Sequence, residues 1–304
     1  IKLDENLILE ILSKSYEKVV ITVIQTENDL KALVKRKPDL VFSGVKYFIF
    51  DEKKEIWLSD YLKEYNIDYI TSNKEALANE YFKDNAKNIV KNANVNTAKF
   101  FTTQPDEHPT ESSLPVTFPL FLKPITGGDS RGINPESVVF DFKKYQAKVL
   151  DIFETQKSRT LVENYLSGKE YSVSILENKS KNILMILPVE IIAVKNKNGH
   201  RVLDYEAKQN DLEEVIAVSD KKIHKELCNI ALNSFRALGG KTIGRIDIKT
   251  SFNGILHFIE ANLMPGLGNG YFSRSFLLNE NMDYEQMILK VADAGMISPE
   301  KIEI

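Results

Sequence analysis

Two stretches near the C-terminal end decide our interpretation of this chain: Gly244-Arg-Ile-Asp-Ile-Lys-Thr250 and His257-Phe-Ile-Glu-Ala-Asn262. Between them lies Asn253-Gly254, the strongest short-range signal for a β-hairpin. If the turn has two residues, Phe252 pairs with Ile255, and every other pair follows from that register. The sequence therefore predicts two antiparallel strands joined by a tight turn.

This register places polar side chains opposite one another. Asp247 falls opposite Glu260 and Arg245 opposite Asn262, and all four share one face because side chains alternate along a strand. Facing carboxylates repel, so a sheet that keeps them needs compensation, which a divalent cation would supply. Two carboxylates and an amide oxygen suit Mg²⁺ or Mn²⁺ that also holds phosphate. The alternative is a solvated face without an ion. The other face is expected in the core and carries Ile246, Ile248, Ile259 and Ala261.

Composition excludes several classes of protein. With 304 residues, 43% hydrophobic and 27% charged, the chain is long enough for two or three domains. A net charge of −3 offers no basic field, so we expect neither nucleic acid nor a membrane as a partner. The single cysteine, Cys228, forms no internal disulfide and fits a cytoplasmic location. No apolar run approaches the roughly 20 residues that span a bilayer.

The N-terminal part alternates helices and short strands. Helices are expected at 5–16, 28–36 and 56–65, and strands at 19–24, 39–43 and 68–71. This alternation is typical of a doubly wound parallel sheet. Because the chain starts with a helix, and with Ile1 rather than Met, we expect that a strand ahead of it is missing.

The remaining elements follow from the same patterns. Ser72-Asn73 is expected to cap a long polar helix at 74–92. Further helices are expected at 141–154, 222–238 and 284–294, strands at 118–123, 160–165, 169–176 and 183–194, and a loop at 195–211.

A lysine enters a glycine loop from the end of a predicted strand. Lys123 is followed by Thr126-Gly127-Gly128-Asp129-Ser130-Arg131-Gly132, in which glycines let consecutive backbone amides surround phosphate oxygens. The loop fits neither the Walker pattern nor the dinucleotide fingerprint. An ordinary glycine loop and a structural ion pair for Lys123 are the alternatives. Farther on, Glu163-Asn164-Tyr165-Leu166 links two predicted strands and offers backbone groups to a base, while Glu170 suits ribose hydroxyls.

The order of these pieces resembles the ATP-grasp superfamily and, within it, the D-alanine–D-alanine ligase family. The pieces are Lys123 with its glycine loop, the 162–166 strand end, Glu170, Arg245-x-Asp247, and Glu260-x-Asn262 followed by Pro265-Gly266. Leu203-Asp-Tyr-Glu-Ala-Lys208 is similar to the family's active-site loop, and 74–95 to its helix that carries the first ATP lysine. The likeness covers about residues 37–295.

The resemblance implies an α/β protein of three domains. These are an N-terminal doubly wound parallel-sheet domain at 1–73 and two α+β domains that clasp ATP, a central lid at 74–164 and a C-terminal domain with the metal site at 165–304. The family tends to dimerise through its N-terminal region, so a homodimer is an assembly that the resemblance allows.

The resemblance also implies a role for each site residue. ATP would be bound by Lys83 or Lys87, Lys123, Gly127, Gly128, Ser130, Gly132, Glu163, Asn164, Tyr165, Leu166, Glu170 and Lys208. Two Mg²⁺ or Mn²⁺ ions would be held by Asp247, Glu260 and Asn262. Lys208 would reach the γ-phosphate, and Arg245 would stabilise a tetrahedral oxyanion. In the family's reaction a carboxylate attacks the γ-phosphate, and an amine then attacks the acyl-phosphate, with release of ADP and phosphate.

The substrate half departs from the family's pattern. The family's N-terminal glycine-rich strand is not matched, and the segment 43–54 replaces a glycine-rich substrate loop. Asp129 stands where the family has a serine, Gln209 where it has a tyrosine or phenylalanine, and 267–272 where it has a serine-containing carboxylate clamp. The substrate site is expected to include Asp129, Gln209, Gly266, Asn269 and Gly270. An acid at Asp129 favours an amine-bearing group, so we expect an acceptor other than simply D-alanine.

Three functions compete on this evidence. The first is an ATP-dependent carboxylate–amine ligase acting on small molecules. The second is a regulatory or partner-binding protein that binds ATP without chemistry, which the retained Arg245 and Lys208 disfavour. The third is a phosphotransferase or carboxylase that uses the same ATP site.

Overall fold

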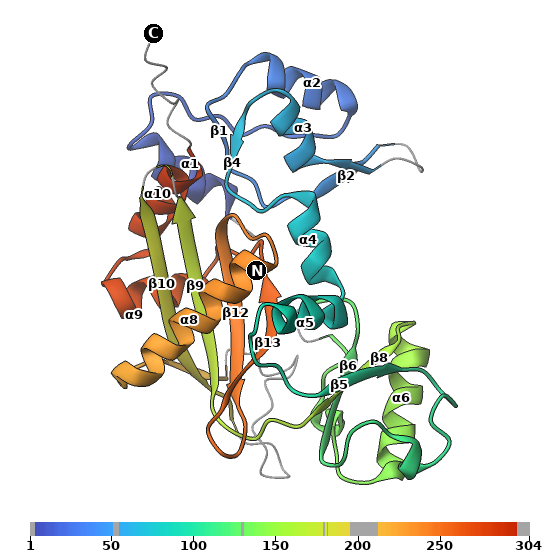
Figure 1. The fold of residues 1–304 in the computed structure, drawn as a ribbon. Helices are drawn as coiled ribbons and strands as arrows, with labels where there is room; N and C mark the ends of the chain where they lie inside the picture. The colour runs from blue at the N-terminus through green and yellow to red at the C-terminus, as the bar shows by residue number, and fades with distance from the viewer. Residues whose placement is uncertain are drawn as a thin grey trace.

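The computed structural model describes residues 4–50, 55–128, 131–178, 180, 182–194 and 212–296. Its largest sheet has five antiparallel strands in the order β11-β10-β9-β12-β13 (Figure 1). The strands are β9 (Glu170–Asn178), β10 (Ile183–Ile192), β11 (Glu214–Ala217), β12 (Thr242–Thr250) and β13 (Leu256–Asn262). The predicted strands of this region are confirmed, whereas β11 has no counterpart in the sequence-based prediction.

The two faces of the large sheet are covered by different helices. Helix α8 (Lys221–Ala237) packs on one face, where Val173, Ile246 and Ile248 are fully buried. Helices α9 (Tyr271–Glu280) and α10 (Tyr284–Gly295) pack on the other, over Leu176 and Ile243. Leu176 and Ile243 lie toward one end of that face, so the other end of the same face is left for polar residues.

A smaller antiparallel sheet forms the lid at the lower right of Figure 1, in the order β5-β8-β6-β7. The strands are β5 (Phe100–Thr103), β6 (Leu120–Pro124), β7 (Val138–Val139) and β8 (Thr160–Asn164). Helix α6 (Phe142–Gln156) packs on it through Val149 and Ile152, and single turns occur at Glu111–Ser113 and Pro135–Ser137. The predicted strands and helix of this region are confirmed.

The predicted long helix at 74–92 is two helices. Asn73 caps α4 (Lys74–Tyr81) by accepting a hydrogen bond from the amide of Ala76, as predicted. Phe82 then takes extended backbone angles, and α5 (Lys83–Asn92) begins after it. Both helices share a hydrophobic core with the large sheet. The division of the chain into three domains stays a prediction.

The N-terminal part contains less sheet than predicted. Among its described residues, only β1 (Leu40–Val41) and β4 (Asp68–Tyr69) pair in parallel, and β2 (Tyr47–Ile49) pairs with β3 (Glu55–Trp57) in an antiparallel manner. The helices are α1 (Glu5–Ser13), α2 (Glu27–Lys35) and α3 (Leu58–Glu64). The predicted strand at 19–24 is wrong, since those residues have no strand partner in the described part of the chain and half of them are exposed.

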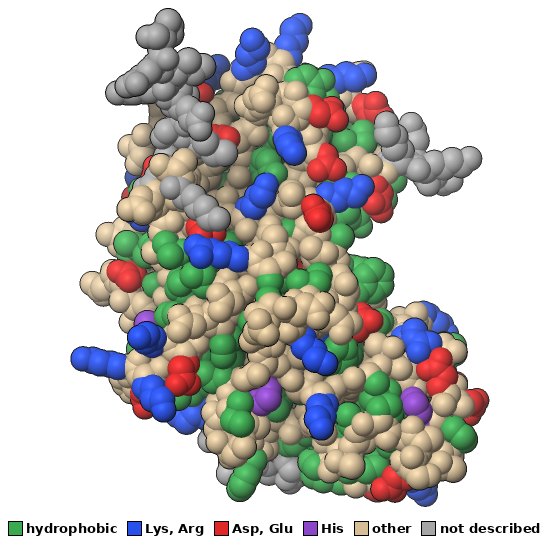
Figure 2. Space-filling view, in the orientation of Figure 1, with side chains coloured by type: hydrophobic (Ala, Val, Ile, Leu, Met, Phe, Trp, Pro, Cys, Tyr) green, Lys and Arg blue, Asp and Glu red, His purple; other side chains and the backbone are tan. Residues whose placement is uncertain are grey.

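Charge is spread evenly over the visible surface. Figure 2 shows acidic and basic side chains interspersed on this face, without a large field of one sign. Within the described part of the chain, no helix is both long and apolar enough to reach across a bilayer.

Gly244 is where α8 approaches the large sheet most closely. A β-carbon at this position would lie 2.6 Å from the ring of Phe235, which is fully buried. Since overpacking a core forces shifts that cost about 1–3 kcal/mol, we expect Gly244→Ala to lower the free energy of unfolding by that amount. Urea denaturation measures it. Gly266→Ala is the control, because a β-carbon there meets no atom within 4 Å; equal losses in both variants would contradict the packing argument.

Candidate active site

The hairpin of β12 and β13 brings the predicted polar residues together. Asp247 pairs with Glu260 and Arg245 with Asn262, as predicted. The assumed two-residue turn is wrong, because Thr250 pairs with Leu256 and the amide of Ser251 donates to the carbonyl of Ile255. A register shift between Asp247 and Ile248 moves the pairing by one residue. The predicted pairing of Asp247 with Glu260 is therefore still correct.

The same irregularity changes one core assignment. Ile248 pairs with Phe258 instead of Ile259, and Phe258 is fully buried whereas Ile259 is only partly so. Ile246 and Ile248 are fully buried as predicted, while Ala261 is also only partly buried. The extra residue of β13 therefore keeps an aromatic ring in the core and still leaves Glu260 beside Asp247.

Asp247 is held by neighbouring side chains. Its Oδ1 accepts hydrogen bonds from Arg245 Nε at 3.0 Å and Ser172 Oγ at 2.7 Å, and its Oδ2 accepts from Arg245 Nη2 at 2.9 Å. Burial lowers the pKa of the Arg245 guanidinium, but Asp247 outweighs burial and raises it overall. Arg245 is therefore paired with Asp247, which lies on the same strand.

These contacts bear on the predicted metal site. The two facing carboxylates are compensated by Arg245 and Ser172, so their repulsion by itself does not require an ion. The donor set still fits Mg²⁺ or Mn²⁺, since two carboxylates and the Asn262 amide lie on adjacent strands. Among the described residues no three His, Cys, Asp or Glu side chains form a metal-binding group. A metal at Asp247 would share that carboxylate with the guanidinium, and the metal role stays a prediction.

Two lysines of the lid side share one carboxylate. Lys87 Nζ lies 2.5 Å from Glu163 Oε1, and Lys123 Nζ lies 2.9 Å from Glu163 Oε2. All three side chains are at least 93% buried. Burial raises the pKa of the Glu163 carboxyl, but the two ammonium groups outweigh burial and lower it to about 2. The cluster therefore holds two positive charges and one negative charge.

Electrostatics links this cluster to the large sheet. Burial lowers the pKa of Lys123, yet Glu163 and then Glu260 outweigh burial and raise it. Burial lowers the pKa of Lys87 overall, although Glu163 and Glu260 oppose that shift. Because Glu260 belongs to β13 of the large sheet, the two lysines lie within electrostatic reach of a predicted metal residue.

The structure distinguishes the two lysines of α5. Lys83, at the first position of the helix, donates from Nζ to the carbonyl oxygen of Gly127 at 2.6 Å. Gly127 has φ +91°, a conformation that favours glycine. Lys83 therefore contacts the glycine loop, whereas Lys87 lies deeper and pairs with Glu163. Which lysine binds a nucleotide stays a prediction.

The other predicted ATP residues lie between the two sheets. Glu170 Oε2 accepts from Lys249 Nζ at 2.8 Å, and Asn164 Nδ2 donates to the Thr117 carbonyl at 3.1 Å. Leu166 follows β8 and is partly buried. Burial raises the pKa of the Tyr165 phenol. The remaining predicted residues of this group are Gly128 and Gly132, which lie in the glycine loop, and Ser130 and Lys208, which lie outside the described residues.

The predicted substrate residues are only partly described. Gly266, Asn269 and Gly270 form the connection between β13 and α9, and the last of them caps α9. Asp129 and Gln209 lie outside the described residues.

The sequence-based prediction missed Glu80, a buried acid that lies at the end of β13, the strand that carries Glu260 and Asn262. Its Oε2 accepts from the backbone amide of Leu263, directly after Asn262, and its Oε1 lies 3.2 Å from Lys46 Nζ. Burial raises the pKa of the Glu80 carboxyl, and Glu260 adds to that rise. Leu263 lies 183 residues away along the chain, so no local pattern reveals the contact.

Tyr271 and Glu213 were also missed. The Tyr271 hydroxyl donates to Glu213 Oε1 at 2.5 Å, and Arg245 Cζ lies 5.5 Å from the centre of the Tyr271 ring. Tyr271 directly follows Gly270, so its nearness to the predicted substrate residues was the available signal.

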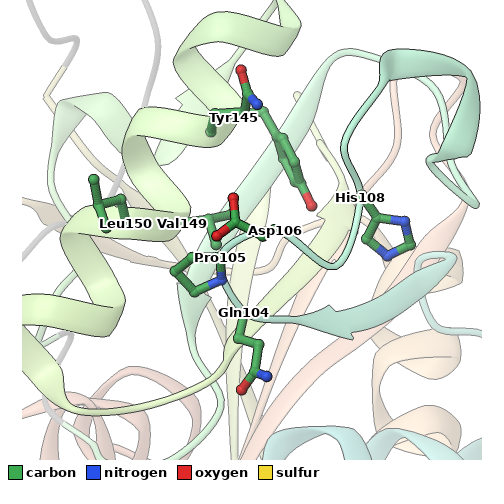
Figure 3. A pocket seen from close by; sticks show the side chains of 8 residues that line it. Gln104, Pro105, Asp106, His108, Tyr145, Val149 and Leu150 are labelled. Atoms are coloured by element: carbon green, nitrogen blue, oxygen red, sulfur yellow. The ribbon is translucent and has the colours of Figure 1, made fainter.

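A cavity in the lid lies apart from these residues. Figure 3 shows it between the end of β5 and α6, with Tyr145 directed toward the loop of Asp106 and His108. None of the predicted site residues lines this cavity. We assign it no part in the reaction.

This chain is similar to known ligases. A family model described as "D-ala D-ala ligase C-terminus" matches residues 81–293. A curated D-alanine--D-alanine ligase of Aquifex aeolicus is 28% identical over 259 residues, which cover 84% of this chain and 82% of that protein.

Solved structures show the same fold. The D-alanine--D-alanine ligase from Bacillus anthracis complexed with ATP matches this chain with a TM-score of 0.68 and 18% sequence identity. The match covers 97% of this chain and 94% of the Bacillus anthracis chain. The VanG D-Ala:D-Ser ligase from Enterococcus faecalis matches with a TM-score of 0.64 and 21% sequence identity. That match covers 84% of this chain and 72% of the VanG chain. The fold is therefore that of the ATP-grasp ligases, as predicted from the sequence.

The shared carboxylate of Glu163 makes a prediction about stability. Glu163→Gln leaves Lys87 and Lys123 buried without their common counter-charge, so we expect a loss of about 3–5 kcal/mol in the free energy of unfolding at pH 7. Urea denaturation measures it, with Glu154→Gln on the exposed side of α6 as the control. A loss as small as that of the control would contradict the coupling of the three groups.

The same carboxylate predicts a pH dependence. Because the folded-state pKa of Glu163 is lowered from 4.5 to about 2, its contribution to stability is present above pH 4.5 and is lost as the pH falls toward 2. The difference in unfolding free energy between the unmodified protein and Glu163→Gln should shrink across that window. A difference that stays constant there would show that Glu163 is not the titrating group.

Proposed function

The chain belongs to the D-alanine–D-alanine ligase family, and on that premise we propose that it is an ATP-dependent carboxylate–amine ligase. The observation that carries the proposal is the juxtaposition of Arg245, Asp247 and Glu260 on the large sheet with the buried lysine pair across from them. Cations that hold phosphates and a cation that holds a developing oxyanion are the groups such a reaction needs.

We propose that ATP binds between the lid sheet and the large sheet. Lys87, Lys123 and Lys83 would bind its phosphates, and the amides of the glycine loop would close over them. Glu163 now forms ion pairs with two of these lysines, Lys87 and Lys123. When phosphates take over that role, the carboxylate becomes available to the adenine amino group, with the 165–166 backbone beside it and Glu170 near the ribose.

The chemistry assigned to the site has two steps. The donor carboxylate attacks the γ-phosphate, ADP leaves, and the acyl-phosphate is then attacked by the acceptor amine, which releases phosphate. Asp247, Glu260 and Asn262 would hold Mg²⁺, which neutralises phosphate charge when bound. Arg245 is fixed by Asp247 and would stabilise the oxyanion of the tetrahedral intermediate, and Lys208 would contact the γ-phosphate.

We further propose that the acceptor is not simply D-alanine. The acid at Asp129 and the altered 267–272 segment change the half of the site that would receive the second substrate. A homodimer and a cytoplasmic location also stay predictions. The non-catalytic ATP-binding alternative is less favoured, because adenine binding alone needs neither Arg245 nor Lys208.

The reaction predicts a requirement for two substrates. Purified protein with MgATP should release ADP only when a carboxylate donor and an amine acceptor are present together, and a coupled ADP assay with an amino-acid panel measures this. Arg245→Lys should reduce kcat by about 10²–10³-fold, as for loss of an oxyanion donor. ATP binding without turnover on any pair would support the non-catalytic alternative.

The metal ligands make a separate prediction. MgATP should raise the melting temperature of the protein, and Glu260→Gln should weaken this Mg²⁺-dependent binding by at least about tenfold, because it removes a direct ligand. Calorimetric titration at several Mg²⁺ concentrations measures it. Glu280→Gln, an exposed change on α9, is the matched control. Unchanged Mg²⁺ dependence in Glu260→Gln would remove this residue from the metal site.

A further inference from the structure

Tyr271 lies where the predicted substrate segment meets the proposed catalytic arginine. It is the first residue of α9 and directly follows Gly270. Its ring faces the Arg245 guanidinium, with 5.5 Å between Cζ and the ring centre, and it packs against Ile191 of β10. Any acceptor whose amine reaches a carbonyl held by Arg245 therefore passes close to this ring.

Glu213 contacts the hydroxyl of Tyr271. It directly precedes β11, and only 8% of it is exposed. Its Oε1 accepts from the Tyr271 hydroxyl at 2.5 Å, whereas its Oε2 is buried and has no hydrogen-bond partner among the residues that the structure describes. A buried carboxylate oxygen left without a donor costs about 1–3 kcal/mol or more, so a protein that keeps one there has a use for it.

The Tyr271 phenol keeps its proton in this pair. Burial raises the pKa of the Tyr271 phenol, and the hydrogen bond to Glu213 raises it further. Tyr271 therefore acts as a neutral donor at physiological pH. Arg245, whose guanidinium faces the Tyr271 ring, donates two hydrogen bonds to Asp247.

We propose that Glu213 and Tyr271 form an acceptor subsite that selects a cationic group, such as a second ammonium, in place of the α-carboxylate of an amino-acid acceptor. The inference rests on the proposed ligase function. Glu213 Oε2 would accept from the cation, and the Tyr271 ring offers it an electron-rich face. A carboxylate at the same place would meet a buried like charge, so the subsite also rejects ordinary amino acids.

The test uses three probes with one carbon skeleton. They are D-alanine, its amide, and the diamine analogue in which an aminomethyl group replaces the carboxylate. Each is titrated calorimetrically into the full chain saturated with MgADP, and each is also tried as acceptor in the ADP assay with a panel of carboxylate donors. We expect the diamine to bind at least about tenfold more tightly than D-alanine, as one charge-assisted contact would provide.

Variants separate a binding role from a structural one. In Glu213→Gln the preference for the diamine should fall to within about threefold, while Glu214→Gln, the exposed neighbour on β11, should leave it unchanged. Tyr271→Phe removes the hydroxyl but keeps the carboxylate, so the diamine preference should persist. If Glu213 only braces Tyr271, both site variants would weaken all three probes equally, and the subsite would be refuted.

The remaining outcomes distinguish this inference from the proposed function. D-Alanine binding as tightly as the diamine, or no binding of any probe, would overturn the subsite. ADP release that uses D-alanine as acceptor would keep the ligase function and remove the subsite. Diamine preference in binding together with no ADP release on any pair would keep the subsite and remove the ligase reaction.

Discussion

The hydrogen-bonded pair of Arg245 and Asp247 is the interaction on which the candidate active site depends. A carboxylate 93% buried needs partners, and Arg245 and Ser172 supply three hydrogen bonds to it. The pair also fixes the plane of the guanidinium, which faces the Tyr271 ring. Since Arg245 and Asp247 lie two residues apart on one strand, backbone geometry sets their spacing and no mobile loop is involved.

The hairpin shows how a correct prediction can follow from an incomplete argument. Asn253-Gly254 indicates a turn, and alternation indicates which side chains share a face, so the facing of Asp247 and Glu260 was available from the sequence. The longer loop and the compensating register shift were not, because they arise from the burial of Phe258 in a core assembled from distant elements. Local patterns define strands well, but bulges depend on tertiary packing.

Contacts between distant segments could not be predicted from the sequence for the same reason. The break at Phe82 lies inside a stretch with uniform helical composition, yet it starts α5 at Lys83, the residue that reaches Gly127. Glu80 sits just before that break and joins Lys46 of the N-terminal part to the backbone that follows Asn262, a predicted metal ligand. The least family-like part of the sequence is thus connected by one buried acid to the part that most resembles the family.

This arrangement explains why the resemblance is strong in one half of the site and weak in the other. Phosphoryl transfer makes the same demand of every ligase of this kind, namely cations around the phosphates at fixed spacing. We propose that Lys87 and Lys123 meet that demand in a buried cluster, where loss of Glu163 would leave both ammonium groups without their shared partner. The acceptor side is different, because changing which group binds there requires only new side chains at the edge of the same sheet. Tyr271 and Glu213 lie at that edge, one side chain removed from Arg245, so they can change the acceptor without disturbing the pair that fixes the reacting centre.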